Sequence, residues 1–317
     1  KRNTILFPVL FAGLIVLFFV NISLGSITIP FKEVYTSLTG GQASKSTWEY
    51  IIINYRLPKA ITAVLVGMGL SISGLVSYSD SLIMIFNLTL FRIPLAGPYV
   101  LGLSSGASLG VAFVILGASI VPSFLSGILL SPYGIVLAST LGSTSVLVLV
   151  LLVSQRLRDT MAILIVGLMF GSFTTASVGV LTYFSSAEQL QKFTFWSMGN
   201  LGNLSWTSIL ILSICVLLGL FLSLLSIKPL NALLLGENYA KSIGLNFNKA
   251  RLVIILATSI LAGSITAYAG PIAFIGLAVP HIAKLVFQTS NHTVLFWSTL
   301  LFGASIMLVC DVVSQMP

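Results

Sequence analysis

Long apolar runs separated by short polar segments make up most of this sequence. Each run is close to the ~20 residues that a helix needs to cross the hydrocarbon core of a bilayer. Period-2 alternation dominates none of the runs, which argues against a β-barrel, and backbone amides in lipid must bond within their own segment. We therefore predict nine membrane-spanning helices: Ile5–Leu24, Ala60–Tyr78, Tyr99–Ile120, Gly134–Val153, Thr160–Phe184, Trp206–Ile227, Leu252–Ala269, Ile272–Phe287 and Val294–Val313.

Composition supports a membrane protein. Hydrophobic residues make up 57% of the chain and charged residues 7%, whereas a soluble domain carries about 25% charged residues. The first apolar run follows Lys1 and Arg2, like a signal peptide, but no small-residue cleavage site follows it, so we expect a retained helix. The expected fold is an all-α polytopic membrane protein with residues 1–317 in one transmembrane domain.

The distribution of Lys and Arg predicts the orientation. With the N-terminus in the cytoplasm and alternating spans, ten basic residues lie inside and five outside, as the positive-inside rule expects. The net charge of +8 then needs no nucleic-acid partner. The outside set is Lys32, Lys45, Arg56, Lys59 and Lys192.

Motifs of catalysis and metal binding are missing from the sequence. There is no phosphate-binding loop, no H-E-x-x-H and no nucleophile elbow. Cys215 and Cys310 both lie in apolar runs without a His or second Cys at ligand spacing. We therefore expect no catalytic residue, no metal site and no bound cofactor on this chain, and no enzyme activity. Asp80, His281 and Asp311 are ionisable, but all fall near span ends.

Small residues mark two places where helices pack or line a passage. Gly102, Gly106 and Gly110 repeat every four positions, a spacing that lets helix backbones approach closely. The second place is a small polar patch in the middle of the fifth span. We expect it either to line a translocation path or to bond back to its own helix. The patch consists of Thr174, Thr175, Ser177 and Gly179.

Glycine and proline interrupt the apolar region near the eighth span. Gly270-Pro271 and Pro280 break helical hydrogen bonding. The sequence therefore predicts a short eighth helix with a bend on each side, and His281 near its cytoplasmic end.

Four stretches resemble a known family. They are Arg56-Leu57-Pro58-Lys59, the run from Arg92 to Ala107, the loop from Leu235 to Gly244, and the run from Gly270 to Lys284. Together, and in this order, they resemble the FecCD-type permeases of ABC importers for iron-siderophores, haem and cobalamin. The resemblance covers nearly the whole chain, and its last stretch is the most specific.

The resemblance implies an architecture and a set of partners. Family members have ten helices per subunit in the type II ABC importer arrangement and pair as dimers, so a second permease subunit, as a homodimer, is expected. Two cytoplasmic ATPase subunits carry the ATP and Mg, and an extracytoplasmic binding protein delivers the chelate. The expected location is the bacterial inner membrane. The nine spans and the end at Pro317 imply that the tenth helix is missing, and residues 75–91 are longer than the family's usual link.

The resemblance also implies functional residues. Arg56 and Lys59 would dock the binding protein, since outside cations suit an acidic partner surface; the alternative is that they anchor the start of the second span. An amphipathic cytoplasmic loop would couple to the ATPase by laying its apolar side in a groove, the alternative being an ordinary interfacial helix. The coupling residues are Leu233, Leu234, Leu235, Gly236, Glu237, Ala240, Lys241 and Gly244.

The expected function is thus the permease subunit of an ATP-driven importer of a metal chelate, with ferric siderophore, haem, cobalamin and molybdate as candidate substrates. The alternative is an ion-coupled secondary transporter without an ATPase partner.

Overall fold

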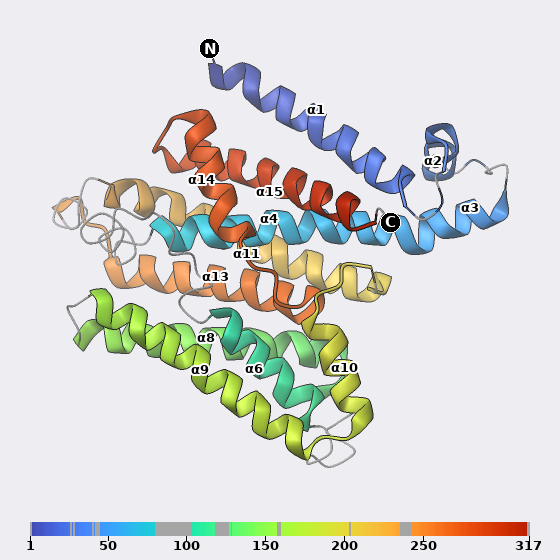
Figure 1. The fold of residues 1–317 in the computed structure, drawn as a ribbon. Helices are drawn as coiled ribbons and strands as arrows, with labels where there is room; N and C mark the ends of the chain where they lie inside the picture. The colour runs from blue at the N-terminus through green and yellow to red at the C-terminus, as the bar shows by residue number, and fades with distance from the viewer. Residues whose placement is uncertain are drawn as a thin grey trace.

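The fold is a bundle of helices (Figure 1). The computed structural model describes residues 2–25, 27, 29–39, 41, 45–79, 103–117, 127, 129–156, 160–202, 204–234 and 242–315, and these ranges contain no strand. The helices are α1 Arg2–Ser23, α2 Phe31–Leu38, α3 Ser46–Ile51, the π-helix η1 Ile52–Arg56, α4 Leu57–Ser79, α6 Leu103–Ile115, α8 Pro132–Arg156, α9 Thr160–Phe184, α10 Ala187–Ser197, α11 Trp206–Leu233, α13 Phe247–Ala269, α14 Ile275–Phe287 and α15 His292–Gln315.

The predicted all-α polytopic fold class is confirmed. Each of the nine predicted spans overlaps one helix: α1, α4, α6, α8, α9, α11, α13, α14 and α15. Within the described ranges, seven helices are long and apolar enough to cross a membrane. The two others, α6 and α14, have 13 residues each. Three short polar helices, α2, α3 and α10, were not predicted.

Contacts between helix ends define an outer end of the bundle. Asn21 near the end of α1 donates to Asp311 near the end of α15. The indole of Trp196 on α10 donates to the carbonyl of Ala267 near the end of α13. These ends, together with α2 and α3, lie on one side of the bundle (Figure 1). The charge distribution predicts that this side faces away from the cytoplasm, so we call it the outer end and the opposite side the inner end.

Helix α4 lies at the centre of one half of the bundle and is packed through small residues. In the apolar window of the Ser46–Ser77 span 83% of the residues are buried, against 11% for α1 and for α9. A Cβ placed on Gly303 of α15 would lie 2.4 Å from the carbonyl oxygen of Gly67 on α4. The two backbones are therefore in direct contact, which is how membrane helices gain van der Waals attraction without a hydrophobic driving force.

The predicted close packing of the glycine repeat holds for its described members. A Cβ on Gly106 would lie 2.5 Å from the carbonyl oxygen of Gly142, and one on Gly110 would lie 2.1 Å from that of Ala138. Helices α6 and α8 thus approach backbone to backbone along this repeat. Gly102 lies outside the described residues.

The region around Gly270 agrees only in part with the prediction. Helix α13 ends at Ala269 and Gly270 has a φ of 76°, so the first bend is present. Pro280, however, lies inside α14, which continues to Phe287, so Pro280 does not end the helix. Proline lacks the N–H that would bond to the carbonyl four residues earlier, here that of Gly276. That oxygen instead lies against Gly74 of α4, where a Cβ would be only 1.6 Å away. Close contact with α4 therefore accommodates the proline without ending the helix.

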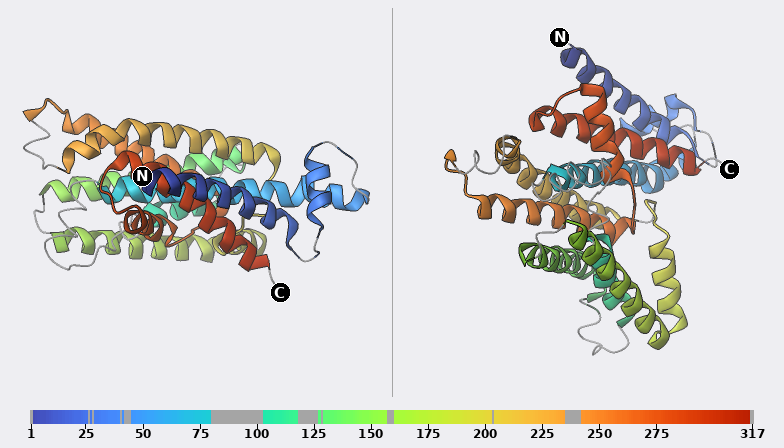
Figure 2. Two further views of the ribbon diagram at one scale, coloured as in Figure 1. Left: turned by 90° about the horizontal axis from the view of Figure 1, so that it is seen from above. Right: turned by 60° about the vertical axis from the view of Figure 1, so that its left-hand side comes forward.

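The second span begins earlier than predicted. The apolar span Ser46–Ser77 has 32 residues, about 48 Å of helix at ~1.5 Å per residue, against a hydrocarbon core of ~30 Å. Its first turns, α3 and η1, therefore project past the other helices at the outer end together with α2 (Figure 2). The hydropathy pattern missed them because polar residues are interspersed there.

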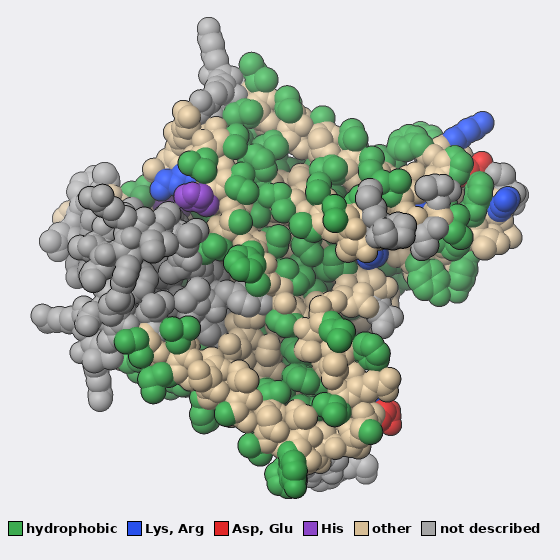
Figure 3. Space-filling view, in the orientation of Figure 1, with side chains coloured by type: hydrophobic (Ala, Val, Ile, Leu, Met, Phe, Trp, Pro, Cys, Tyr) green, Lys and Arg blue, Asp and Glu red, His purple; other side chains and the backbone are tan. Residues whose placement is uncertain are grey.

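Apolar side chains are spread over the face of the bundle drawn in Figure 3, among the described residues. Examples from helices far apart in the sequence are Val9 of α1, Leu141 of α8, Phe173 of α9 and Leu217 of α11, each more than half exposed. Such a surface suits contact with lipid or with another apolar helix.

Candidate functional site

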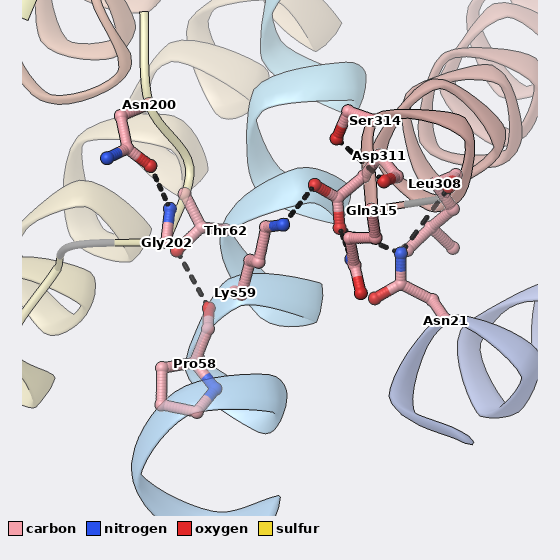
Figure 4. A network of polar contacts seen from close by, with 10 residues as sticks. All are labelled: Asn21, Pro58, Lys59, Thr62, Asn200, Gly202, Leu308, Asp311, Ser314 and Gln315. Atoms are coloured by element: carbon pink, nitrogen blue, oxygen red, sulfur yellow. Dashed lines mark hydrogen bonds and ion pairs between the residues drawn. The ribbon is translucent and has the colours of Figure 1, made fainter. Parts of the chain in front are cut away.

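A network of polar side chains joins three helices at the outer end (Figure 4). The ammonium of Lys59, in the first turn of α4, lies 3.0 Å from Oδ1 of Asp311 on α15. The Lys59 side chain is 25% exposed and that of Asp311 2%. Because a buried carboxylate is costly without a counter-charge, this ion pair is what allows Asp311 to be charged inside the bundle.

Two side-chain amides donate hydrogen bonds to the other oxygen of Asp311. Its Oδ2 accepts hydrogen bonds from Asn21 of α1 at 2.8 Å and from Gln315 of α15 at 2.7 Å. Asn21 is 2% exposed. Both carboxylate oxygens therefore have donors, and the network holds α1, α4 and α15 in one arrangement.

Arg56, in the π-helix η1, caps the end of α1. Its Nη1 donates to the carbonyls of Ile22 at 2.7 Å and Ser23 at 2.9 Å, and its Nη2 donates to the carbonyl of Ile27. The last carbonyls of a helix have no partner within the helix, and a cation near them is favourable. The guanidinium thus fixes where the chain leaves α1.

Arg56 and Lys59 share a cavity of 570 Å³ that opens at the outer end. Its walls come from α1, η1, α4, α15 and the loop before α11. The lining residues include Asn21, Tyr55, Asn200, Gly202, Ser314 and Gln315.

The two predicted docking residues are therefore brought together, but both have partners within the chain. These contacts are of the kind expected from the anchoring alternative. Docking of a binding protein stays a prediction, and it concerns a pocket whose Lys59 charge is already balanced by Asp311.

The predicted translocation patch on α9 is divided between two environments. Thr174 and Thr175 line a cavity of 280 Å³ together with Ser104, Ser105 and Ser108 of α6 and Phe193 and Trp196 of α10. Ser177 is partly exposed, and a Cβ on Gly179 would have nothing within 4 Å.

Hydroxyl groups of this patch bond to their own helix. Thr174 and Thr175 both donate to the carbonyl of Gly171, at 2.8 and 2.9 Å, and Ser177 donates to that of Phe173 at 2.9 Å. This is the back-bonded arrangement that the sequence left open. It leaves the hydroxyl oxygens able to accept, so a role in lining a path stays a prediction.

Only part of the predicted coupling segment is described. Leu233 ends α11, Leu234 caps it with its N–H bonded to the carbonyl of Leu230, and Gly244 has a φ of 81° before α13. Leu235, Gly236, Glu237, Ala240 and Lys241 lie outside the described residues. The described members lie at the inner end, between α11 and α13, as a cytoplasmic loop requires.

A contact near the coupling segment was missed by the sequence reading. Oδ1 of Asn231, near the end of α11, accepts from the backbone N–H of His292 at 2.9 Å and lies 3.0 Å from Nδ1 of the same residue. His292 is 4% exposed. Asn231 and His292 each lie next to an apolar run in the sequence. The sequence does not indicate, however, that these two ends meet.

Comparison with known proteins agrees with this architecture. The model of the FecCD transport family matches residues 13–316. The chain belongs to the FecCD transport family. The resemblance noted in the sequence is thereby confirmed.

Relatives of this FecCD-family chain have named transport roles. The chain is 33% identical over 314 residues to the hemin transport system permease protein HmuU of Yersinia pestis, covering 97% of this chain and 88% of the relative. It is 32% identical over 277 residues to the vitamin B12 import system permease protein BtuC of Klebsiella pneumoniae, covering 87% and 77%. A solved structure described as an inward-facing metal-chelate type ABC transporter matches with a TM-score of 0.76 at 27% identity, covering 98% and 92%.

Proposed function

We propose that this chain is the membrane-spanning permease subunit of an ABC importer that moves a metal chelate into the cytoplasm. The observation that carries the proposal is the match of the FecCD family to residues 13–316. The similarity of the whole helical bundle to a metal-chelate type ABC transporter supports it. The chain itself would be no enzyme, because the energy would come from ATP and Mg on two cytoplasmic ATPase subunits.

The substrate is proposed to be a metal held in an organic chelate. HmuU and BtuC, the relatives described above, are named for hemin and for vitamin B12. Haem and cobalamin are therefore the first substrates to test, followed by ferric siderophores. Molybdate, an oxyanion and not a chelate, is the last candidate. A chelate of roughly 10 Å is better accommodated at a seam between two bundles than within one, so we propose that two copies of the permease work together in the inner membrane.

Two regions of the chain would meet the other subunits. The inner-end segment from Leu233 to Gly244 would contact the ATPase, and the outer-end cavity with Arg56 and Lys59 would receive the binding protein. Lipid would contact the exposed apolar side chains. The path itself would follow α9, where Thr174, Thr175, Ser177 and Gly179 lie.

The alternative, an ion-coupled carrier without an ATPase, has weaker support. In the described part of the chain, Asp311 lies near an end of α15 and is paired with Lys59. Carriers driven by protons or sodium place such groups near the midplane of the membrane.

Reconstitution tests the two functions directly. The permease, co-expressed with its ATPase and purified into proteoliposomes, is given labelled haem or cobalamin together with the binding protein of the same transporter. Uptake that requires both ATP and the binding protein supports the importer. Uptake driven by an ion gradient in permease-only liposomes would refute it.

A further inference from the structure

An acidic residue, Asp311, lies beside one of the two cations of the outer-end cavity. A docking partner with an acidic surface would need the charge of that cation. Arg56 and Lys59 are the cations that line the cavity, and Lys59 lies 3.0 Å from Asp311. The Asp311 carboxylate is buried behind Lys59, whereas the Lys59 side chain is partly exposed. Asp311 thus neutralises Lys59 from the protein side of the cavity.

We propose that Asp311 is an internal competitor for Lys59 that weakens the docking of an acidic binding-protein side chain at this cavity. This rests on the proposed docking role of the cavity. An incoming Asp or Glu carboxylate needs the same ammonium that Asp311 already holds. Its attraction is reduced because the pair presents almost no net charge, which leaves Arg56 as the dominant cation.

The geometry favours competition over simple positioning. Asp311 is fixed by Asn21 and Gln315 as well as by Lys59, so its own location does not depend on the ion pair. Among the described contacts, the ammonium of Lys59 is held by Asp311 alone. The flexible Lys59 side chain can therefore turn toward the cavity while Asp311 keeps two donors, and the cost of leaving the buried Asp311 without its counter-charge is what opposes docking.

The function of such a competitor would be release. A binding protein must dissociate after each delivery, and affinity is tuned mainly through the dissociation rate. A carboxylate that recaptures Lys59 would shorten the lifetime of the complex with the binding protein, because the Lys59–Asp311 ion pair re-forms as the partner leaves.

The test is binding of the fluorescently labelled binding protein of the same transporter to the permease–ATPase complex in nanodiscs. Asp311→Asn keeps the shape and the amide contacts, because Asn21 and Gln315 can rotate to present oxygen. It is expected to tighten binding by roughly tenfold, the size of one unit charge a few ångströms from the contact in a partly solvated site. The gain should shrink as salt is raised, because screening weakens exposed charges.

A matched control removes a carboxylate elsewhere at the outer end. Glu188 of α10 pairs with Lys192 at 2.7 Å and is exposed. The hydrogen bond and the charge of Lys192 lower the pKa of Glu188, so it is ionised at neutral pH. Glu188→Gln therefore changes the net charge equally without touching Lys59, and its affinity should match the wild type.

A second variant keeps the test decisive if Asp311→Asn does not fold. Asp311→Ser removes the carboxylate with a smaller side chain and keeps Lys59 in place. It should also bind more tightly than the wild type; an affinity equal to that of the wild type would overturn the inference.

The outcomes separate the two proposals. No binding by the wild type would refute the docking role and this inference with it. Wild-type binding that Asp311→Asn leaves unchanged or weakens would refute the inference alone and leave docking intact.

Discussion

Asn231 and His292 join α11 to α15 at the inner end, with one amide oxygen 2.9 Å from the backbone nitrogen and 3.0 Å from Nδ1 of His292. Asn231 lies two residues before Leu233, where the predicted coupling segment begins. The contact therefore positions the start of that segment relative to α15.

Removing this contact should destabilise the protein. Asn231→Ala leaves the backbone N–H of His292 without that acceptor, at a cost of about 1–3 kcal/mol. We expect a lower melting temperature of the purified permease in nanodiscs. Asn54→Ala is the control, because the exposed Asn54 bonds only to the carbonyl of Tyr50 among the described contacts. Equal melting of both variants would show that the contact contributes little.

Packing between α4 and α15 should not tolerate a methyl group. In Gly303→Ala the new Cβ would lie 2.2 Å from Oγ of Ser71 and 2.4 Å from the carbonyl oxygen of Gly67. Because the second contact is with backbone, the helices must move apart, and we expect a loss of about 1–3 kcal/mol. Gly13→Ala in α1, where nothing lies within 4 Å, is the matched control and should melt like the wild type.

Reversing the charge at the docking cavity needs a paired design. Lys59→Glu alone would place a second carboxylate beside the buried Asp311, so its effect on docking could not be told from a folding defect. Lys59→Glu with Asp311→Lys keeps an ion pair but turns the carboxylate to the cavity side. We expect this double variant to insert and to bind the binding protein roughly tenfold more weakly. Its melting temperature should fall somewhat, because Lys at position 311 is larger than Asp and faces the amide donors of Asn21 and Gln315. Unchanged affinity would leave Arg56 and Lys59 as anchors of α1 and α4.

The coupling role of the inner-end segment can be tested at a described residue. Leu234→Asp would bury an unpaired carboxylate at the proposed ATPase contact, which costs several kcal/mol. The permease should still insert, while its co-purification with the ATPase and its transport both fall. Leu234→Met conserves volume and apolarity and should behave like the wild type. Normal transport by Leu234→Asp would contradict the assignment.

The proposed pairing of two permeases along α9 predicts a cysteine crosslink. Ser177 is partly exposed on α9, and Ser177→Cys should form a disulfide-linked dimer in native membranes. The background must lack Cys215 and Cys310, which are free. Val9→Cys, on the equally exposed α1, is the control and should stay monomeric. Monomers from both variants, with full transport, would argue against pairing through this helix.

The sequence by itself determined the class of fold and the position of its spans. Runs such as Thr160–Phe184 coincide with their helices because lipid forces every backbone amide to bond within its segment, so length and apolarity suffice. The sequence did not predict α10, because this helix is polar and too short to give the signal of a membrane span. It also did not predict that α14 continues through Pro280, where the freed carbonyl of Gly276 lies against Gly74 of α4.

Only the tertiary structure decided what the polar groups do. From the sequence, Lys59 was predicted to be a cation on the outer side and Asp311 an acidic residue near the end of a span. Nothing in their local sequence indicates that they meet. Their pairing depends on how α4 and α15 pack through Gly67 and Gly303, which sets the register between the two helices. A charge in a span must find a partner, since burial alone is too costly; which partner it finds is a property of helix packing and not of the helices taken one at a time.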